Sequence, residues 1–92
     1  MAYRKDGGVD LRRLPRIVRR KLGKENADGQ AIETMDEVIL EYDSRLTGRR
    51  RLETILHEAL HLACPWMNEH QVLRTARYQA MVLHYIDKNP EE

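Results

Sequence analysis

The stretch ILHEALHLA, residues 55–63, decides how the rest of the sequence is interpreted. Most of its residues are good helix formers, and it contains the pattern His-Glu-x-x-His. Residues four apart on a helix lie one turn above each other, so His57 and His61 point the same way. Two imidazoles in this arrangement can bind one zinc ion at ~2.0 to 2.1 Å, and Glu58 stands next to the first. The stretch predicts a helix that carries a zinc site.

Length and composition limit what can surround such a site. The 92 residues allow one small domain with a single modest core. With 41% hydrophobic and 34% charged residues, the chain has the composition of a globular protein. The single cysteine, Cys64, excludes a disulfide within the chain. No apolar run approaches the ~20 residues of a membrane span and no signal-peptide core is evident, so we expect a cytoplasmic location.

Two segments upstream of the quoted stretch have clear patterns. Apolar residues recur at helical spacing between Asp10 and Gly23, with Arg or Lys at the other positions, which predicts an amphipathic N-terminal helix. Residues 31–34 and 38–42 are predicted to be extended, the second because it is rich in β-branched and aromatic residues. We expect these two strands to pair as a short antiparallel ribbon.

Two helices are expected downstream. Thr47 is the expected cap of the central helix, which should run to about Cys64 and end at Pro65. Asn68, followed three residues later by Gln71, forms a capping box for a C-terminal helix. The predicted fold class is α+β, with an arm at residues 1–9, one domain at residues 10–87 and a tail at residues 88–92.

Charge is unevenly distributed, although the net charge is only +1. Residues 1–24 hold nine Lys or Arg against two Asp, and residues 25–46 hold one Arg against seven Asp or Glu. A basic segment followed by an acidic one can be self-complementary. This interpretation is favoured over phosphate binding by the basic segment, because a charge run is usually a solvated or paired face.

A catalytic zinc site usually has three protein ligands, so a third must come from outside the quoted stretch. The turn at Pro65 can return the chain to the metal, and Glu69 and His70 follow it. They point about 100° apart on a helix, so only one of them should face the ion. Glu69 is favoured because it shares a face with the apolar residues of the last helix. His70 and Cys64 are the alternatives.

Glu58 is suited to act on a metal-activated water. Zinc lowers the pKa of such a water to around 7, and a carboxylate within reach can take its proton as the water attacks a carbonyl. The same carboxylate can pass the proton to the leaving amine. Donors to the developing oxyanion are not evident from the pattern. The candidates, without a ranking, are His70, Arg74, Tyr78 and His84.

The motif and the segment before it resemble a known family. Residues 53–61 (ETILHEALH) follow a strand that ends with LEYD at residues 40–43 and a connector LTGRR at residues 46–50. This combination resembles small zincin-like metallopeptidase domains of bacteria and bacteriophages, whose broader relatives include the SprT-like and gluzincin groups. The resemblance covers roughly residues 36–86 and implies a minimal zincin-like core.

The resemblance implies a zinc-dependent metallopeptidase. In it, His57, His61 and Glu69 would be the metal ligands and Glu58 the catalytic acid and base. The substrate would be a peptide or protein, and we expect an extended peptide to lie along the strand at residues 38–42. The alternative is a zinc-stabilised binding or assembly module without catalysis.

In that alternative, the basic helix from Arg12 to Lys24 would contact nucleic acid or an acidic partner, although nucleic acid is not the favoured partner. No membrane partner is expected. An oligomer would cover apolar surface that so short a chain leaves exposed.

Overall fold

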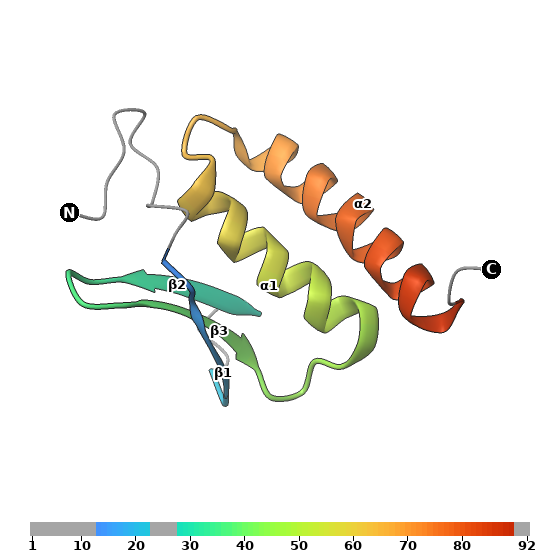
Figure 1. Ribbon diagram of the computed structural model, residues 1–92, viewed down its shortest axis with the longest axis horizontal. Coiled ribbons are helices and arrows are strands. Elements are labelled where there is room, and N and C mark those ends of the chain that lie inside the picture. Colours follow the sequence, from blue (N-terminus) through green and yellow to red (C-terminus); the bar gives the residue numbers. More distant parts are fainter. Residues whose placement is uncertain (1–12, 23–27, 90–92) are drawn as a thin grey trace.

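The computed structural model describes residues 13–22 and 28–89, which form a three-stranded sheet and two helices (Figure 1). The strands are β1 (Arg16–Arg20), β2 (Gly29–Glu33) and β3 (Val38–Asp43), and the helices are α1 (Gly48–Ala63) and α2 (Glu69–Lys88). Helix α1 lies between the sheet and α2, so the elements form three layers. The predicted α+β class is confirmed.

The sheet has the order β1-β3-β2, with β3 in the centre. Strand β2 pairs antiparallel with β3, and Ala31 lies opposite Leu40. The predicted ribbon is therefore present. Strand β1 pairs with the other edge of β3 in the parallel direction, which places Ile17 opposite the same Leu40. The connection from β1 to β2 has to cross from one edge of the sheet to the other.

The predicted N-terminal helix is wrong, because its central part, RIVRR, is strand β1. Two adjacent β-branched residues, Ile17 and Val18, favour an extended backbone, and Pro15 is well tolerated just before a strand. Pairing with β3 then decides in favour of the strand over an isolated amphipathic helix. The two ends of the predicted helix, Asp10 and Gly23, lie outside the described residues, as do the predicted arm at residues 1–9 and the last three residues of the tail.

The core lies on two sides of α1, between this helix and the sheet and between this helix and α2. One face of β3 is buried through Val38, Leu40 and Tyr42 as expected, and Glu41 and Asp43 on its other face are buried as well. Helix α2 buries a second set one turn apart, which consists of Val72, Ala76 and Ala80. These small residues allow α2 to approach α1 closely. No residue of α1 is fully buried, although this helix contacts both the sheet and α2.

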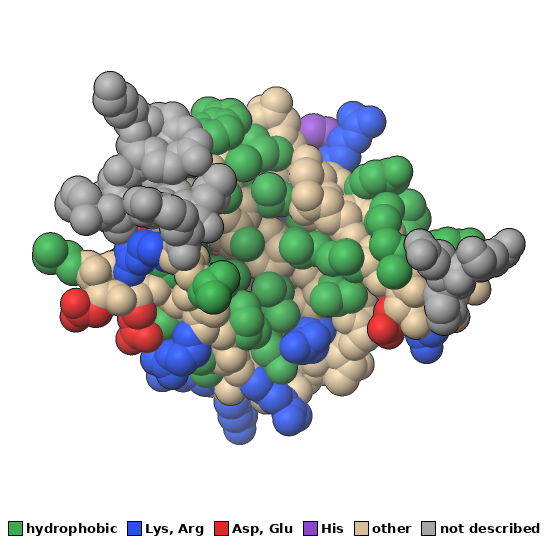
Figure 2. Space-filling view, viewed as in Figure 1, with side chains coloured by type: hydrophobic (Ala, Val, Ile, Leu, Met, Phe, Trp, Pro, Cys, Tyr) green, Lys and Arg blue, Asp and Glu red, His purple; other side chains and the backbone are tan. Residues whose placement is uncertain are grey.

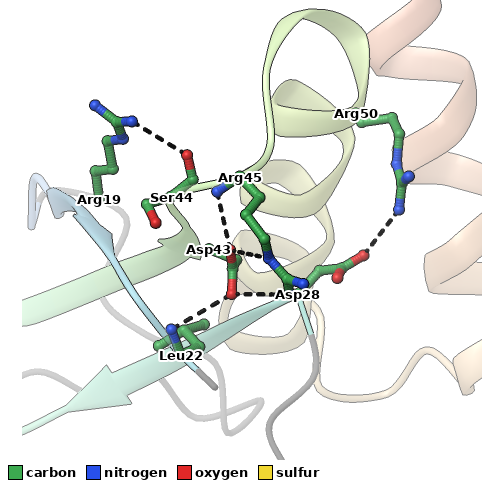
Figure 3. A network of polar contacts seen from close by, with 7 residues as sticks. All are labelled: Arg19, Leu22, Asp28, Asp43, Ser44, Arg45 and Arg50. Atoms are coloured by element: carbon green, nitrogen blue, oxygen red, sulfur yellow. Dashed lines mark hydrogen bonds and ion pairs between the residues drawn. The ribbon is translucent and has the colours of Figure 1, made fainter. Parts of the chain in front are cut away.

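A buried carboxylate fixes the end of the sheet to the loop that enters α1 (Figure 3). Asp43 is 1% exposed; its Oδ1 accepts hydrogen bonds from the backbone N and Nε of Arg45, at 2.9 and 2.8 Å. Its Oδ2 accepts from Arg45 Nη2 at 3.2 Å and from the backbone N of Leu22 at 3.4 Å. These bonds, with those to Arg45 as the largest cause, lower the pKa of Asp43 to about 2. We call this cluster of Asp43, Arg45 and Leu22 the Asp43 node.

Both helices begin at the predicted residues. Helix α1 follows Thr47, whose side chain makes no capping bond, and its first residue Gly48 has a φ of 56°, which glycine adopts without strain. Helix α2 has the predicted capping box, in which Gln71 N donates to Asn68 Oδ1 and Asn68 N donates to Gln71 Oε1, both at 2.8 Å. Neither of the two described helices has the length and apolar character needed to cross a membrane.

Candidate metal centre

Two histidines of α1 form one half of the candidate metal centre. His57 and His61 lie one turn apart on the same face of the helix, as their spacing predicts. Their ring centroids are 4.8 Å apart and the rings meet edge to face, at 67°. The side chain of His57 is 20% exposed and that of His61 is 39% exposed. The pair is therefore shielded on one side and accessible on the other.

Glu69 supplies the other half because the chain reverses at residues 64–67. The capping box of Asn68 starts α2 immediately after this turn, so Glu69 is the first residue of the helix. Its Oε1 lies 2.9 Å from His57 Nε2 and 3.3 Å from His61 Nε2. The structure thus brings together three predicted ligands from two helices.

The donor set and its spacing fit a zinc ion. Two ligands at ~2.0 to 2.1 Å from a tetrahedral zinc lie roughly 3.3 Å from each other. The distances from Glu69 Oε1 to the two imidazole nitrogens, 2.9 and 3.3 Å, are close to that separation. All three ligand atoms lie within 4.8 Å of one another. Their lone pairs repel one another unless a proton or a cation lies between them, and three protein ligands leave the fourth position of the ion open.

The alternative third ligands do not join this group. His70 is exposed on α2, and Cys64 is a free, partly buried thiol. Within residues 13–22 and 28–89, the only group of three or more potential ligands consists of His57, His61 and Glu69. The structure brings Glu69 to the histidines, while binding of zinc by these residues stays a prediction.

Glu58 follows the first ligand and faces the start of β2. Its Cγ is 3.5 Å from the point that a Cβ atom on Gly29 would occupy. Burial raises the pKa of Glu58, the charges of His57 and His61 act to lower it, and the charge of Glu69 acts to raise it. A carboxylate whose pKa is raised by burial binds a proton more readily than a solvated one, which suits Glu58 to accept a proton and to return it.

A cleft of about 360 Å³ adjoins the candidate metal centre, and one of the three candidate ligands, His57, lines it. Its lining residues are Asp28, Gly29, Arg50, Glu53, Thr54, His57, Glu58, Leu73 and Arg77. Two ion pairs lie within this lining, Arg50 with Asp28 at 3.2 Å and Arg77 with Glu53 at 3.3 Å. Because a ligand and the candidate base both line the cleft, a molecule held there would contact the reactive part of the site.

Sequence reasoning named only His57 and Glu58 among the lining residues. The other lining residues of α1 lie one or two turns before them, and those of α2 lie one and two turns after Glu69. Helical spacing was therefore the signal that could have found them. Asp28 and Gly29 come from a distant segment, and no local pattern pointed to them.

The four residues considered as oxyanion donors lie elsewhere. These are His70, Arg74, Tyr78 and His84, all on α2 and none in the lining of the cleft. Arg77 lines the cleft instead, and only its Nε is used in the ion pair with Glu53. A guanidinium carries five N–H donors, so Arg77 is better placed than the four to donate to a bound carbonyl.

The strand expected to hold substrate is not a free edge. Residues 38–42 belong to β3, which is paired with a strand on both sides. Strand β2 has one unpaired side within the described part of the chain, and its first residue, Gly29, lines the cleft. An extended peptide would therefore pair with β2 and not with β3.

Within residues 13–22, most of the basic side chains pair with acidic residues of the second segment. Three arginines each pair with a glutamate, namely Arg13 with Glu33 at 3.6 Å, Arg16 with Glu37 at 3.3 Å and Arg20 with Glu41 at 2.9 Å. Hydrogen bonds from Gln30 and Arg20 lower the pKa of Glu41, which keeps it ionised. The described part of residues 12–24 thus forms a strand with paired charges, and the basic helix assumed for nucleic-acid binding is absent from it.

Comparisons with protein-family models, with curated proteins and with solved structures find no match for this chain. The zincin-like resemblance therefore stays a proposal that depends on the motif and on the geometry of the site.

Proposed function

We propose that this protein is a zinc-dependent hydrolase of the metallopeptidase type. The proposal is carried by one observation: Glu69 Oε1 lies 2.9 Å from His57 Nε2 and 3.3 Å from His61 Nε2, and His57 also lines a cleft. His57, His61 and Glu69 would hold the ion. When bound, zinc supplies a Lewis acid that activates water and polarises a carbonyl.

The side chains around the cleft supply the remaining parts of a hydrolytic site. Glu58 takes the proton of the attacking water on a carboxylate oxygen and passes it to the amine that leaves, so the peptide bond is cleaved with no net change in protonation. Arg77 donates to the carbonyl oxygen as negative charge develops. The unpaired side of β2 at Gly29 holds the peptide backbone in an extended conformation.

Replacement of one carboxylate tests the proposal. The Glu58→Gln variant keeps the size of the side chain and leaves the three ligands intact. Cleavage of a peptide library by the zinc-loaded protein should fall by about 100-fold or more in this variant, while zinc remains bound. Mass spectrometry of the products and metal analysis of the same samples measure both.

A matched control is Glu37→Gln, on the turn between β2 and β3, which should cleave as the parent does. Equal cleavage by the parent and the Glu58→Gln variant would show that the mechanism is wrong. If the parent cleaves nothing and chelation only lowers its melting temperature, the alternative holds, in which zinc stabilises a binding module.

A further inference from the structure

The outer side of α2 carries an apolar depression that continues from the cleft. Its volume is about 360 Å³, and only α2 contributes to its lining. The lining residues are His70, Leu73, Arg74, Arg77, Tyr78 and Met81, and we call this surface the α2 groove. Leu73 and Arg77 also line the cleft, so the two hollows share a wall.

Helical spacing explains this continuity. The side of α2 that is buried on α1 holds Val72, Ala76 and Ala80. Leu73 and Arg77 each lie about 100° further round, at the border of the cleft, and Tyr78 lies about 100° beyond Arg77. Figure 2 shows a histidine, a basic side chain and then hydrophobic side chains along the outer side of α2. Tyr78 is 64% exposed and Met81 is 45% exposed, so their apolar surface is accessible.

The charges around the α2 groove have one sign. Its lining contains His70, Arg74 and Arg77 and no Asp or Glu. Arg77 uses only Nε in its pair with Glu53. No carboxylate lies within ion-pair distance of Arg74 in the part of the chain that the structure describes. An apolar floor with a cationic rim is complementary to an apolar side chain that lies next to a carboxylate.

We propose that the α2 groove binds the part of a peptide substrate that extends beyond the cleft, and that it selects an apolar side chain next to an acidic one. This assignment rests on the proposed function, because it takes the cleft as the site of cleavage. It adds a binding surface to a short chain that has few walls around its reactive residues. The apolar side chain packs on Leu73, Tyr78 and Met81, and the carboxylate pairs with Arg74.

The test uses peptides of equal length on an Ala/Ser background. One series carries a Glu-Leu pair that is moved one position at a time, and two further series carry Lys-Leu and Glu-Ala pairs. Binding to the zinc-loaded Glu58→Gln protein is measured by fluorescence anisotropy, and cleavage by the zinc-loaded parent is measured by mass spectrometry. At the best position, the Glu-Leu peptide should bind at least about 10-fold more tightly than either of the others. The Glu-Ala peptide lacks the apolar side chain that the groove would bury, and the Lys-Leu peptide carries a charge of the same sign as Arg74.

Two variants in the same Glu58→Gln background locate the binding surface. Met81→Lys should weaken binding of the Glu-Leu peptide by about 10-fold, since it places a charge on the apolar floor. Leu83→Lys is the matched control, because Leu83 is also 45% exposed and lies about 200° round the same helix. The Leu83→Lys variant should bind the Glu-Leu peptide as tightly as the Glu58→Gln protein does. Arg74→Glu should reverse the preference, so that the Lys-Leu peptide binds more tightly than the Glu-Leu peptide.

The outcomes separate the groove from the proposed function. If Met81→Lys and Leu83→Lys bind the Glu-Leu peptide alike, the groove is not the binding surface, whatever the parent cleaves. If binding depends on Met81 and Arg74 but the parent cleaves no peptide, the groove stands and the proposed function fails. If light scattering finds a dimer that Met81→Lys converts to a monomer, a second copy occupies the groove and the assignment to substrate is overturned.

Discussion

The Asp43 node and the candidate metal centre are both clusters of a carboxylate with nitrogen atoms, but their polar atoms are satisfied differently. In the node, two carboxylate oxygens of a residue that is 1% exposed accept four hydrogen bonds from N–H groups. In the metal centre, one oxygen of Glu69, whose side chain is 72% exposed, lies against two imidazole nitrogens. Donors and acceptors match in the node, whereas three potential ligand atoms converge in the metal centre.

This difference separates a structural cluster from a reactive one. The four hydrogen bonds accepted by Asp43 hold the segment after β1, the end of β3 and the entry to α1 together. The metal centre lies at the junction of α1 and α2, next to a cleft, and its ligand atoms repel one another unless a cation or a proton joins them. We therefore expect substitutions in the node to change stability and substitutions in the centre to change metal binding.

The largest effect is expected for His57→Ala. Loss of a residue that only supports a metal ligand typically weakens metal binding by about 10- to 100-fold. Loss of one of the three proposed ligands themselves should therefore weaken zinc binding by more than about 100-fold. Competition with a chromogenic chelator measures this affinity, and circular dichroism checks that the variant is folded. His70→Ala is the matched control and should bind zinc as the parent does. Equal losses in both variants would show that the ligand set is wrong.

The next effect is the loss of stability in Asp43→Asn. The folded pKa of Asp43, about 2, lies below its ordinary value of 3.8, so its ionised form stabilises the folded state. This contribution is complete above about pH 4 and is lost as the pH falls toward about 2. Between about pH 4 and about pH 2, the melting temperature of the parent should therefore fall further than that of the variant.

Above about pH 5, Asp43→Asn should melt below the parent and bind zinc with unchanged affinity. If the melting temperatures of the two proteins change with pH by the same amount between pH 2 and pH 6, the assigned role of the node is contradicted.

A smaller effect is expected at Gly29, which lies between the node and the cleft. A Cβ atom there would lie 2.5 Å from Thr54 Cγ2 and 2.8 Å from the carbonyl oxygen of Glu41. Gly29→Ala should reduce the free energy of unfolding by about 1 to 3 kcal/mol, because backbone and helix must separate. Denaturant unfolding measures this. Adding Thr54→Ser, which removes the methyl group, should recover part of the loss, and a fully stable Gly29→Ala protein would exclude the close approach.

The smallest effect is expected for Asn68→Ala, which removes the cap of α2. Loss of this cap should reduce the free energy of unfolding by about 1 kcal/mol. Because Glu69 is the first residue of the helix, zinc affinity should also fall by a few fold, measured by the same chelator competition. The control is Asn89→Ala at the other end of α2, where Asn89 Nδ2 donates to Tyr85 O. A change in zinc affinity in the control alone would contradict the role of the cap.

Local patterns predicted the parts of the fold that depend on local interactions. The capping box at Asn68 is formed by neighbours in the sequence, and β3 could be predicted from its β-branched and aromatic residues. The candidate ligands His57 and His61 could be placed on one face for the same reason, since one helix fixes their spacing. Glu69 followed from the turn that leads into α2.

The parts that could not be predicted depend on contacts between distant segments. Ile17 and Val18 fit a helical pattern as well as an extended one, and the parallel pairing with β3 decides in favour of the strand. Because β1 pairs with β3, β3 is the central strand and has no free edge. The edge with which a peptide could pair is therefore that of β2. Gly29 approaches Glu58 because β2 pairs with β3 and the sheet packs against α1, so the far wall of the cleft had no local signal.

An anomalous-diffraction map, collected at the zinc edge from crystals grown with zinc, tests the proposed metal centre most directly. We predict one strong peak at ~2.0 to 2.1 Å from His57 Nε2, His61 Nε2 and a carboxylate oxygen of Glu69. The absence of a peak between these atoms, or a peak bound by His70 or Cys64 in place of Glu69, would contradict the proposed centre.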